Sequence, residues 1–482
     1  MIRIDSKRNK FTYNIYHIVK AFYPGEEVEQ KVDGEQEALV TLEMPGGSSF
    51  SVFPGDVGLP QISDPDERQL QEEKWAVTRS VYRYLEKFIG EKLAWGILTG
   101  VRPTKLIMQK LEAGISREEI LRSFQEEDLV SPEKAQLAYE TACREHELLS
   151  RLDCEDGFSL YVGIPFCPSV CSYCSFSSSP IDVWRDRVDG YLDALIRELK
   201  VLGEMAAGRQ PDTVYIGGGT PTTLEPEQLD RLLKAVTKYF DLGRTLEFTI
   251  EAGRPDSITE EKLRVIRRYP VTRISVNPQT MQQKTLDLVG RRHTVQDVVE
   301  AFHMARRLGF DNINMDLIAG LPGETAADMQ DTLRQVEALH PDSLTVHALA
   351  IKRAARFGQE GRTAQLHSEI TQMIEDASEC ACRMGLKPYY LYRQKNIAGN
   401  FENVGYAEVD KAGIYNILIM EEKQTILAAG AGASTKILLK EPIRTEKGKE
   451  IGLVRIENVK NITEYISRID EMIERKGEWL WR

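Results

Sequence analysis

Residues 161–174 read YVGIPFCPSVCSYC, an apolar strand followed by a loop that contains three cysteines. The thiols of Cys167, Cys171 and Cys174 follow one another with C-x3-C-x2-C spacing. Three soft ligands in one loop are typical of an iron–sulfur cluster or of zinc. Structural zinc takes four ligands, and no fourth Cys or His follows in this loop. The spacing therefore favours a [4Fe–4S] cluster with one iron left open, over zinc and over inert core thiols.

Six short strand-like segments, each followed by a helix-like pattern, extend from this loop through residue 349. The helical patterns have apolar residues at i, i+3, i+4 and i+7, as in Leu229, Leu232, Leu233 and Val236. Repeated β-then-α units predict a parallel sheet or barrel. The predicted strands are residues 159–164, 213–216, 245–251, 272–277, 312–318 and 343–349.

Polar and apolar side chains alternate along two of these strands. Asn314 and Asp316 would share one face of their strand and Met315 would point to the other. The strand at 245–251 repeats the pattern and ends at Glu251. Polar side chains inside a helix-covered sheet indicate a lumen that holds a ligand, and in α/β barrels the chemistry lies at the C-terminal strand ends.

The chain has 482 residues, enough for roughly three domains. We predict an α/β fold in which a partial (β/α)6 barrel occupies residues 155–365. An α+β and helical domain at 1–150, whose role the sequence leaves open, would precede the barrel. A smaller α+β domain at 366–482 would follow it and cover the substrate.

Composition and charge exclude several classes of protein. With 42% hydrophobic and 28% charged residues the chain is neither disordered nor collagenous. Its net charge of −12 argues against a general nucleic-acid binder. No apolar stretch approaches the ~20 residues that span a membrane, and the N-terminus lacks the apolar core of a secretory signal. Seven cysteines, an odd number, suggest a reducing compartment, so we expect the cytoplasm.

A glycine-rich motif, GGGTPT at residues 217–222, follows the second predicted strand. Glycines let the backbone approach a ligand closely, and exposed backbone groups there can bind polar ligand atoms. A plain tight turn is the alternative interpretation.

The cysteine loop and the glycine motif, in this order along the strands, resemble the radical S-adenosylmethionine (SAM) superfamily. Within it, the chain is similar to the oxygen-independent coproporphyrinogen III oxidase family and to its HemZ-type branch, through the segments VGIPFC, NPQT and IKRAAR. The resemblance runs from about residue 159 to 350 and, more weakly, through 399–406 and 429–434. It does not cover the first 150 residues.

The resemblance implies a [4Fe–4S] cluster and SAM as cofactors, with one-electron cleavage of SAM. The implied reaction is oxidative decarboxylation of coproporphyrinogen III propionates to vinyls, which gives protoporphyrinogen IX. Such a reaction uses an electron donor for the cluster and an electron acceptor.

The same resemblance assigns the site residues. The catalytic residues would be the three cysteines and Tyr161. Tyr161 would flank the methionyl group of SAM. Glu251 matches a ribose-binding acid, and Ile318 and Ala350 match apolar walls for adenine. The implied SAM contacts are Tyr161, Gly218, Gly219, Thr220, Glu251, Gln279, Arg291, Asp316, Ile318 and Ala350. For each one alone, a capped strand end, a turn residue or a solvated charge is the alternative.

Coproporphyrinogen III carries four propionates, so an acidic protein must gather cations locally, and Arg suits carboxylates through bidentate hydrogen bonds. Arg353 and Arg356 follow the last predicted strand, and Arg393 comes from the C-terminal part. We expect these three to contact the substrate. A solvated basic helix start is the alternative.

Two positions depart from the oxidase family, which usually has His where this chain has Gly163 and Cys where it has Phe176. The related haem chaperones typically carry His and Trp in the C-terminal part, and the corresponding residues 393–400 contain neither. The alternatives are therefore a haem-binding chaperone on the same scaffold, or a radical SAM enzyme that acts on haem or another tetrapyrrole.

Two further features lie outside these motifs. The segment GILTGVRPTK at residues 96–105 could hold an anion or dock on the barrel, although a structural turn is the simpler interpretation. Cys143, Cys154, Cys380 and Cys382 lack the spacing of a second cluster and are expected to be core or free thiols.

Overall fold

The computed structural model describes the chain except residues 24, 59–66, 101, 155, 176–177, 207, 350–366, 394–400, 445–449 and 481–482. The chain forms two compact units. The first contains Met1–Cys143 together with Leu391–Asn403, and the second contains Arg144–Tyr390 together with Val404–Arg482.

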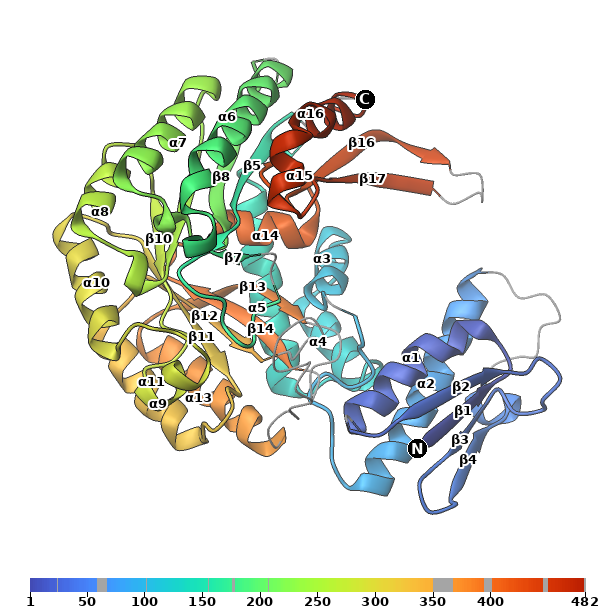
Figure 1. Cartoon of the computed structure of the whole chain (residues 1–482). Coiled ribbons are helices and arrows are strands. Elements are labelled where there is room, and N and C mark those ends of the chain that lie inside the picture. Colours follow the sequence, from blue (N-terminus) through green and yellow to red (C-terminus); the bar gives the residue numbers. More distant parts are fainter. Residues whose placement is uncertain are drawn as a thin grey trace. The chain divides into compact units, whose positions relative to one another are not determined.

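The first unit contains a four-stranded sheet with the order β2-β1-β3-β4. Figure 1 shows helices α1 and α2 against this sheet. Ile4 of β1, Ile15 of α1 and Val81 of α2 are fully buried in the core between them. The elements are β1 Ile2–Ser6, α1 Asn9–Phe22, β2 Val28–Val32, β3 Val40–Glu43, β4 Ser49–Val52, α2 Glu67–Ile89, α3 Thr104–Glu112, α4 Arg117–Glu126 and α5 Pro132–Leu149. This is the α+β architecture, followed by helices, that the sequence predicts.

The second unit is built on six parallel strands that lie side by side in chain order. They are β5 Phe158–Ile164, β8 Pro211–Gly218, β9 Glu247–Gly253, β10 Arg273–Val276, β11 Ile313–Ala319 and β12 Ser343–Ala348. All six predicted strands are confirmed. The sheet continues beyond both outer strands, because β15 pairs parallel with β5 and β14 pairs antiparallel with β12. The (β/α)6 unit is therefore a partial barrel within the described residues.

Helices α6, α7, α8, α10 and α11 follow the strands and lie along their outer side (Figure 1). The helices of this unit are α6 Val188–Met205, α7 Pro226–Tyr239, α8 Glu260–Arg267, α9 Gln283–Leu288, α10 Val295–Arg307, α11 Ala326–Leu339, α13 His367–Arg383, α14 Ile414–Glu421, α15 Ile462–Ser467 and α16 Ile469–Gly477. The further strands are β6 Phe166–Cys167, β7 Ser179–Pro180, β13 Lys387–Arg393, β14 Glu402–Ala407, β15 Thr425–Ala429, β16 Ser434–Arg444 and β17 Glu450–Glu457.

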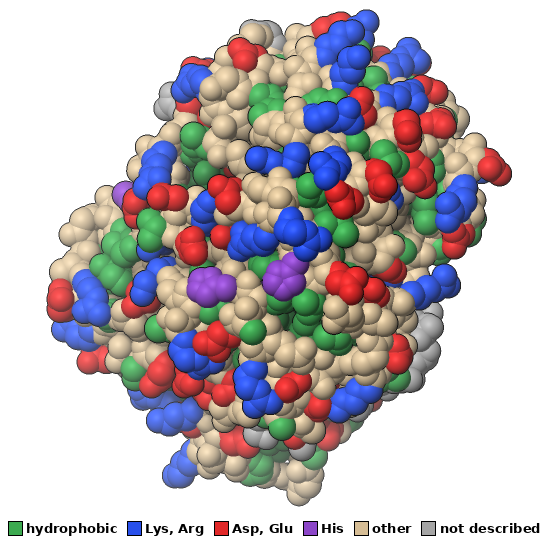
Figure 2. Space-filling view, turned by 90° about the vertical axis from the view of Figure 1, so that its left-hand side faces the viewer, with side chains coloured by type: hydrophobic (Ala, Val, Ile, Leu, Met, Phe, Trp, Pro, Cys, Tyr) green, Lys and Arg blue, Asp and Glu red, His purple; other side chains and the backbone are tan. Residues whose placement is uncertain are grey.

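Helix α7 shows why these segments are helical. It begins with a capping box between Glu225 and Gln228 and with proline at its first position. Leu229 and Leu233 are among the residues that form its buried stripe. The outer helical side carries mixed charge: Figure 2 shows Lys and Arg interspersed with Asp and Glu there. No helix in the described parts of the chain is long and apolar enough to cross a membrane.

The C-terminal residues complete the second unit through a buried charge cluster. Lys476 of α16 and Glu198 of α6 form an ion pair in which both side chains are fully buried. Tyr465 donates a hydrogen bond to Glu198 at 2.5 Å, and the backbone N–H of Gly430 and the amide of Asn458 donate at 2.9 and 2.8 Å. Helix α16 and the loop after β15 are thereby attached to α6.

Candidate active site

The three cysteines lie in the loop that follows β5, at the C-terminal end of the parallel strands. The loop is held by its backbone and hydroxyl groups. The N–H of Ser172 donates to the carbonyl of Val289 at 3.0 Å, and the hydroxyl of Ser169 donates to that of Gly290 at 2.8 Å. The segment after α9 therefore fixes the position of the cysteine loop.

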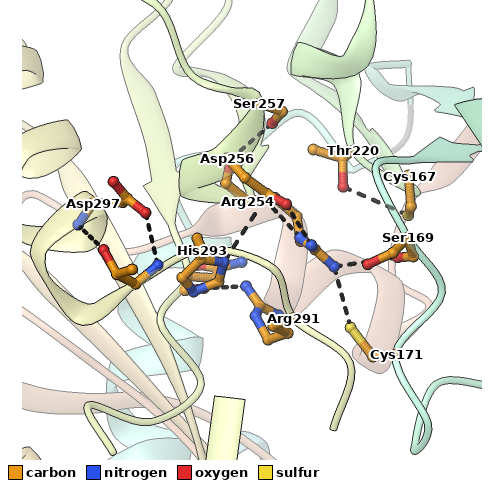
Figure 3. A network of polar contacts seen from close by, with 12 residues as sticks. Cys167, Ser169, Cys171, Thr220, Arg254, Asp256, Ser257, Arg291, His293 and Asp297 are labelled. Atoms are coloured by element: carbon orange, nitrogen blue, oxygen red, sulfur yellow. Dashed lines mark hydrogen bonds and ion pairs between the residues drawn. The ribbon is translucent and has the colours of Figure 1, made fainter. Parts of the chain in front are cut away.

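Hydrogen-bond donors face two of the thiols, as Figure 3 shows. The Thr220 hydroxyl donates to Sγ of Cys167 at 3.5 Å, and the Arg254 guanidinium donates to Sγ of Cys171 at 3.5 Å. Burial raises the pKa of the Cys167 thiol, while the hydrogen bond with Thr220 opposes that effect. All three cysteines, including Cys174, are half-buried and outside any disulfide.

The donor set fits a cluster better than a single ion. Among the described residues, no three His, Cys, Asp or Glu side chains are grouped as ligands of one metal ion. A [4Fe–4S] cluster takes its thiolates at different iron atoms. Soft sulfur ligands on one loop, with donors directed at two of the sulfurs, match that requirement.

The glycine motif packs against the start of the cysteine loop. The N–H of Thr220 donates to the carbonyl of Phe166 at 2.7 Å. A Cβ at Gly219 would lie 2.4 Å from that same carbonyl oxygen, so only glycine allows this approach. A Cβ at Gly217 would lie 2.7 Å from the carboxyl carbon of Glu251. The motif is therefore a close-packed backbone between the predicted cluster ligands and the predicted ribose acid.

Three tyrosine rings stack beside this motif. The ring centroids of Tyr215 and Tyr415 are 4.5 Å apart, and Tyr161 stacks at 6.3 Å from Tyr215 and 6.0 Å from Tyr415. The hydroxyl of Tyr215 donates to Glu251. Burial and the nearby charge of Asp316 raise the pKa of Glu251 to about 7, although the Tyr215 hydrogen bond lowers it.

Two predicted SAM contacts, Gln279 and Arg291, and the neighbouring Asn277 have buried polar atoms without a partner in the described chain. These atoms are Oε1 of Gln279, Oδ1 of Asn277 and Nε of Arg291. Gln279 has a φ of 67°, and its backbone bonds to Asp316 and Ile318 at 2.9 Å each keep it there. Unsatisfied buried polar groups cost free energy, so these atoms suit a polar ligand such as the methionyl and ribose groups of SAM.

An apolar cluster lies next to these polar atoms. Ile318 packs with Val289 and Leu321, and the ring of Tyr173 contacts them. The Tyr173 hydroxyl accepts a hydrogen bond from Arg291 at 3.2 Å. Burial and then the charge of Cys171 raise the pKa of Tyr173. Ile318, a predicted adenine contact, therefore has apolar surroundings.

Four predicted site residues lie outside the described part of the second unit. Ala350, Arg353 and Arg356 lie outside the described residues. Arg393 belongs to the first unit, where it is almost fully buried. Its guanidinium lies 5.3 Å from the centroid of the Trp95 ring and donates to the carbonyl of Leu98 at 2.6 Å. Burial lowers the pKa of Arg393 to about 9.

The segment at 96–105 also lies in the first unit. Gly96 has a φ of 51°, and a Cβ there would lie 2.1 Å from the carbonyl oxygen of Asp128. Ile97 donates to the same oxygen at 2.9 Å. These contacts explain why glycine occupies position 96, and they support the interpretation of this position as part of a tight structural turn.

Sequence reasoning missed Arg254, Asp256, Tyr215 and Tyr415. The first two follow the end of β9, a position that a barrel uses for its site, and this was the available signal. Tyr215 alternates into the lumen on β8 and could have been found from its strand register. Tyr415 comes from α14, far away in sequence, and no local pattern indicates its contact with Tyr215.

Comparisons with known proteins identify the family of this chain. Residues 161–336 match the Radical SAM superfamily. The chain is 38% identical to the oxygen-independent coproporphyrinogen-III oxidase-like protein HemZ of Bacillus subtilis, over 97% of this chain and 95% of that protein. It is also 36% identical to the heme chaperone HemW of B. subtilis, over 43% of this chain and 55% of HemW.

The solved structure of the Escherichia coli coproporphyrinogen III oxidase HemN matches with a TM-score of 0.54 at 24% identity, over 71% of this chain and 74% of HemN. That likeness confirms the fold. The superfamily uses a [4Fe–4S] cluster and SAM, and these are the predicted cofactors. The chain therefore belongs to the radical SAM superfamily and, within it, to the family of oxygen-independent coproporphyrinogen-III oxidase-like proteins that includes HemZ.

Proposed function

We propose that this protein is a radical SAM oxidoreductase that decarboxylates coproporphyrinogen III propionates to vinyls and yields protoporphyrinogen IX. The observation that carries the proposal is the identity of 38% with an oxidase-like protein over nearly the whole of both chains. The polar lumen next to the cysteine loop supports it, because the reaction needs a site that holds SAM and substrate together.

In this proposal Cys167, Cys171 and Cys174 hold the cluster. When bound, the reduced cluster and SAM supply one-electron chemistry that removes a hydrogen atom from an unactivated carbon. The protein supplies position and exclusion of water. The backbone of Gly219 and Thr220 would contact the methionyl end of SAM beside the cysteine loop.

The remaining SAM contacts are inferred from polar side chains near the cysteine loop. The ionised carboxylate of Glu251 would accept hydrogen bonds from the ribose hydroxyls, with Tyr215 fixing its orientation. Oε1 of Gln279 would accept and Nε of Arg291 would donate, since both atoms lack partners within the described chain. Tyr161 would form an aromatic wall beside the glycine motif, because a Cβ at Gly218 would lie 3.1 Å from its hydroxyl.

We assign the propionate contacts to Arg353 and Arg356. Arg393 would have to leave the Leu98 carbonyl and the Trp95 ring before it could bind a carboxylate. Arg353→Ala is expected to weaken porphyrinogen binding more than SAM binding in equilibrium titrations. Equal loss of both affinities would contradict this assignment.

The proposal includes an electron donor for the cluster, an electron acceptor for the decarboxylation, and a cytoplasmic location. The odd number of cysteines, seven, supports this location, because thiols that bind metal or stay unpaired are typical of a reducing compartment.

A haem-binding chaperone is the second candidate, because the chain is 36% identical to HemW over 43% of its length. The absence of His and Trp from residues 393–400 weakens this candidate. Haem bound in one equivalent, without SAM turnover, would favour it.

The test is an anaerobic assay of the reconstituted protein with SAM, a reductant, cell extract as electron acceptor, and coproporphyrinogen III. Oxidised porphyrins are separated by chromatography. We expect a monovinyl intermediate and protoporphyrin, both absent without SAM and with Cys167→Ala. Cys382→Ala is the matched control, because this exposed thiol lies in α13. Its product yield should equal that of the unmodified protein.

The outcomes separate the candidates. Product formation would show that Gly163 is compatible with decarboxylation. Unchanged coproporphyrin together with accumulating 5′-deoxyadenosine would keep the radical SAM assignment and reject this substrate. Added haem would then be tested for consumption under the same reducing conditions, which would indicate a different tetrapyrrole reaction.

A further inference from the structure

A buried arginine from outside the cysteine motif reaches one of the cluster thiols. Arg254 follows β9, and its side chain is only 5% exposed. One of its terminal nitrogens donates to Sγ of Cys171 at 3.5 Å and to the carbonyl of Ser169 at 3.2 Å. Figure 3 shows the guanidinium between the loop and Asp256. The arginine thus touches both the loop backbone and a ligand sulfur.

The other side of the guanidinium is fixed by a carboxylate. Nε and the second terminal nitrogen of Arg254 donate to the two oxygens of Asp256 at 2.9 and 2.6 Å. This bidentate geometry leaves little rotational freedom. The buried His293 lies next to this carboxylate, with its Nδ1 3.7 Å from Oδ1 of Asp256. The donor directed at Cys171 is therefore preorganised rather than a mobile surface charge.

Two of the thiols, those of Cys167 and Cys171, differ in their surroundings. Cys167 faces the neutral hydroxyl of Thr220. Cys171 faces the cationic Arg254 and also lies beside Tyr173, whose hydroxyl is bonded to the second buried arginine, Arg291. Positive charge from two different segments of the barrel thus converges near Cys171.

Hydrogen bonds to cluster sulfurs, net charge and solvent exposure set the reduction potential of iron–sulfur clusters. Reduction adds negative charge to an already anionic group, and a nearby cation stabilises the reduced state more than the oxidised one. The effect is strong where the surroundings are buried, because the effective dielectric constant is low. We propose that Arg254 is a positioning residue that orients the Cys171 thiolate and raises the reduction potential of the cluster.

This inference rests on the cluster that the proposed function also uses, but not on the substrate. A merely structural role is the competing explanation, because Arg254 also holds the loop through the Ser169 carbonyl. The reduction potential distinguishes the two roles. Loss of a backbone contact alone would lower cluster content or stability without a systematic shift in potential.

The experiment is a redox titration of the full-length reconstituted protein, without SAM, followed by electron paramagnetic resonance of the reduced cluster. Arg254→Gln is expected to shift the midpoint potential to a more negative value. Arg254→Lys keeps the charge but not the bidentate clamp, and a smaller shift in the same direction is expected. Iron and sulfide content are measured for every sample.

Arg306→Gln is the matched control. Arg306 pairs with Asp342 at 2.6 Å and donates to the carbonyl of His340 at 3.0 Å, so its loss also removes an ion pair and a backbone contact. None of the described hydrogen-bond partners of Arg306 is a cysteine. The Arg306→Gln variant should therefore keep the reduction potential of the unmodified protein.

A midpoint potential equal to that of the unmodified protein, in an Arg254→Gln sample with full cluster content, overturns the proposal. If Arg254→Gln fails to hold the cluster, Arg254→Lys decides: a more negative potential supports the proposal and an unchanged one overturns it. The decarboxylation assay is independent of these results. A protein that makes no protoporphyrin still gives a potential, so the two failures are distinguishable.

Discussion

Glu251 is an acid of the site whose ionisation changes near neutral pH. Burial and Asp316 raise its pKa to about 7. Its proposed role as an acceptor for the ribose hydroxyls needs the carboxylate form, which predominates above that pH. We therefore expect SAM affinity to fall as the pH is lowered from 8 to 6. Calorimetric titration of the anaerobic, reconstituted protein across this range measures the effect.

Two variants test whether Glu251 causes this pH dependence. Glu251→Gln should bind SAM more weakly at pH 8 and lose the pH dependence. Tyr215→Phe removes a hydrogen bond that lowers the pKa of Glu251, so the fall in affinity should begin at a higher pH. A flat profile in the unmodified protein would mean that Glu251 does not contact SAM as an anion.

The candidate site residues that the sequence indicates are those whose signals are local. Cysteine spacing selects Cys167, Cys171 and Cys174, and strand alternation places Glu251 and Asp316 on one side of the sheet. The environment of Cys171 could not be predicted in this way, because its contact with Arg254 depends on how the end of β9 meets the cysteine loop.

At the scale of elements, the glycine motif and the cysteine loop are close-packed. A Cβ at Gly219 would lie 2.4 Å from the carbonyl oxygen of Phe166, so Gly219→Ala must displace one of the two segments. We expect a loss of about 1–3 kcal/mol in stability, the range for overpacking, together with reduced cluster content. Urea denaturation and iron analysis measure the two effects.

The matched control is Gly190→Ala in α6. Nothing lies within 4 Å of a Cβ at this exposed helical position. Alanine there should stabilise the protein by about 0.5–1 kcal/mol through its helix propensity and leave the iron content unchanged. A loss of cluster in this variant too would argue that any alanine, and not the close approach at Gly219, disturbs the loop.

The ion pair between α6 and α16 gives a second prediction at this scale. Lys476→Met would leave Glu198 buried without its cation, and removal of one partner of a buried pair costs about 3–5 kcal/mol. The double variant Glu198→Gln with Lys476→Met should be less destabilised than Lys476→Met alone, as measured by urea denaturation. Additive losses would show that the two side chains are not coupled.

The strands were the most predictable elements. Each of the six predicted segments overlaps an observed strand, because a buried parallel strand has a short apolar run and a helix follows it. The strands β14 and β15 were harder to place. They join opposite edges of the same sheet, and pairing partners so far apart in sequence leave no periodic signal.

At the scale of the whole molecule, the first unit is discontinuous in sequence. Glu402 accepts hydrogen bonds from Trp95, at 2.6 Å, and from Lys134 inside this unit. The sequence predicts an N-terminal domain at residues 1–150. Because Leu391–Asn403 also belong to this unit, its core depends on a segment that no N-terminal pattern could reveal.

Deletion of residues 1–143 tests that dependence. It would leave the carboxylate of Glu402 and the guanidinium of Arg393 without the partners that surround them. We expect this deletion to lower the soluble yield and cluster content, and we expect recovery when 391–403 are also replaced by a short Gly/Ser linker. Equal yields from both deletions would show that the segment folds without the N-terminal residues.

The discontinuous unit also imposes an order on biosynthesis. Asn403 is the 260th residue after Cys143, and a ribosome that adds about 5–20 residues per second makes it about 13–52 s later. Throughout this interval Trp95 and Lys134 are synthesised but Glu402 is not. The first unit therefore cannot complete its core until residues 391–403 have been synthesised, which happens after the barrel strands. Translation speed through the barrel thus determines how long the N-terminal part is open to chaperones.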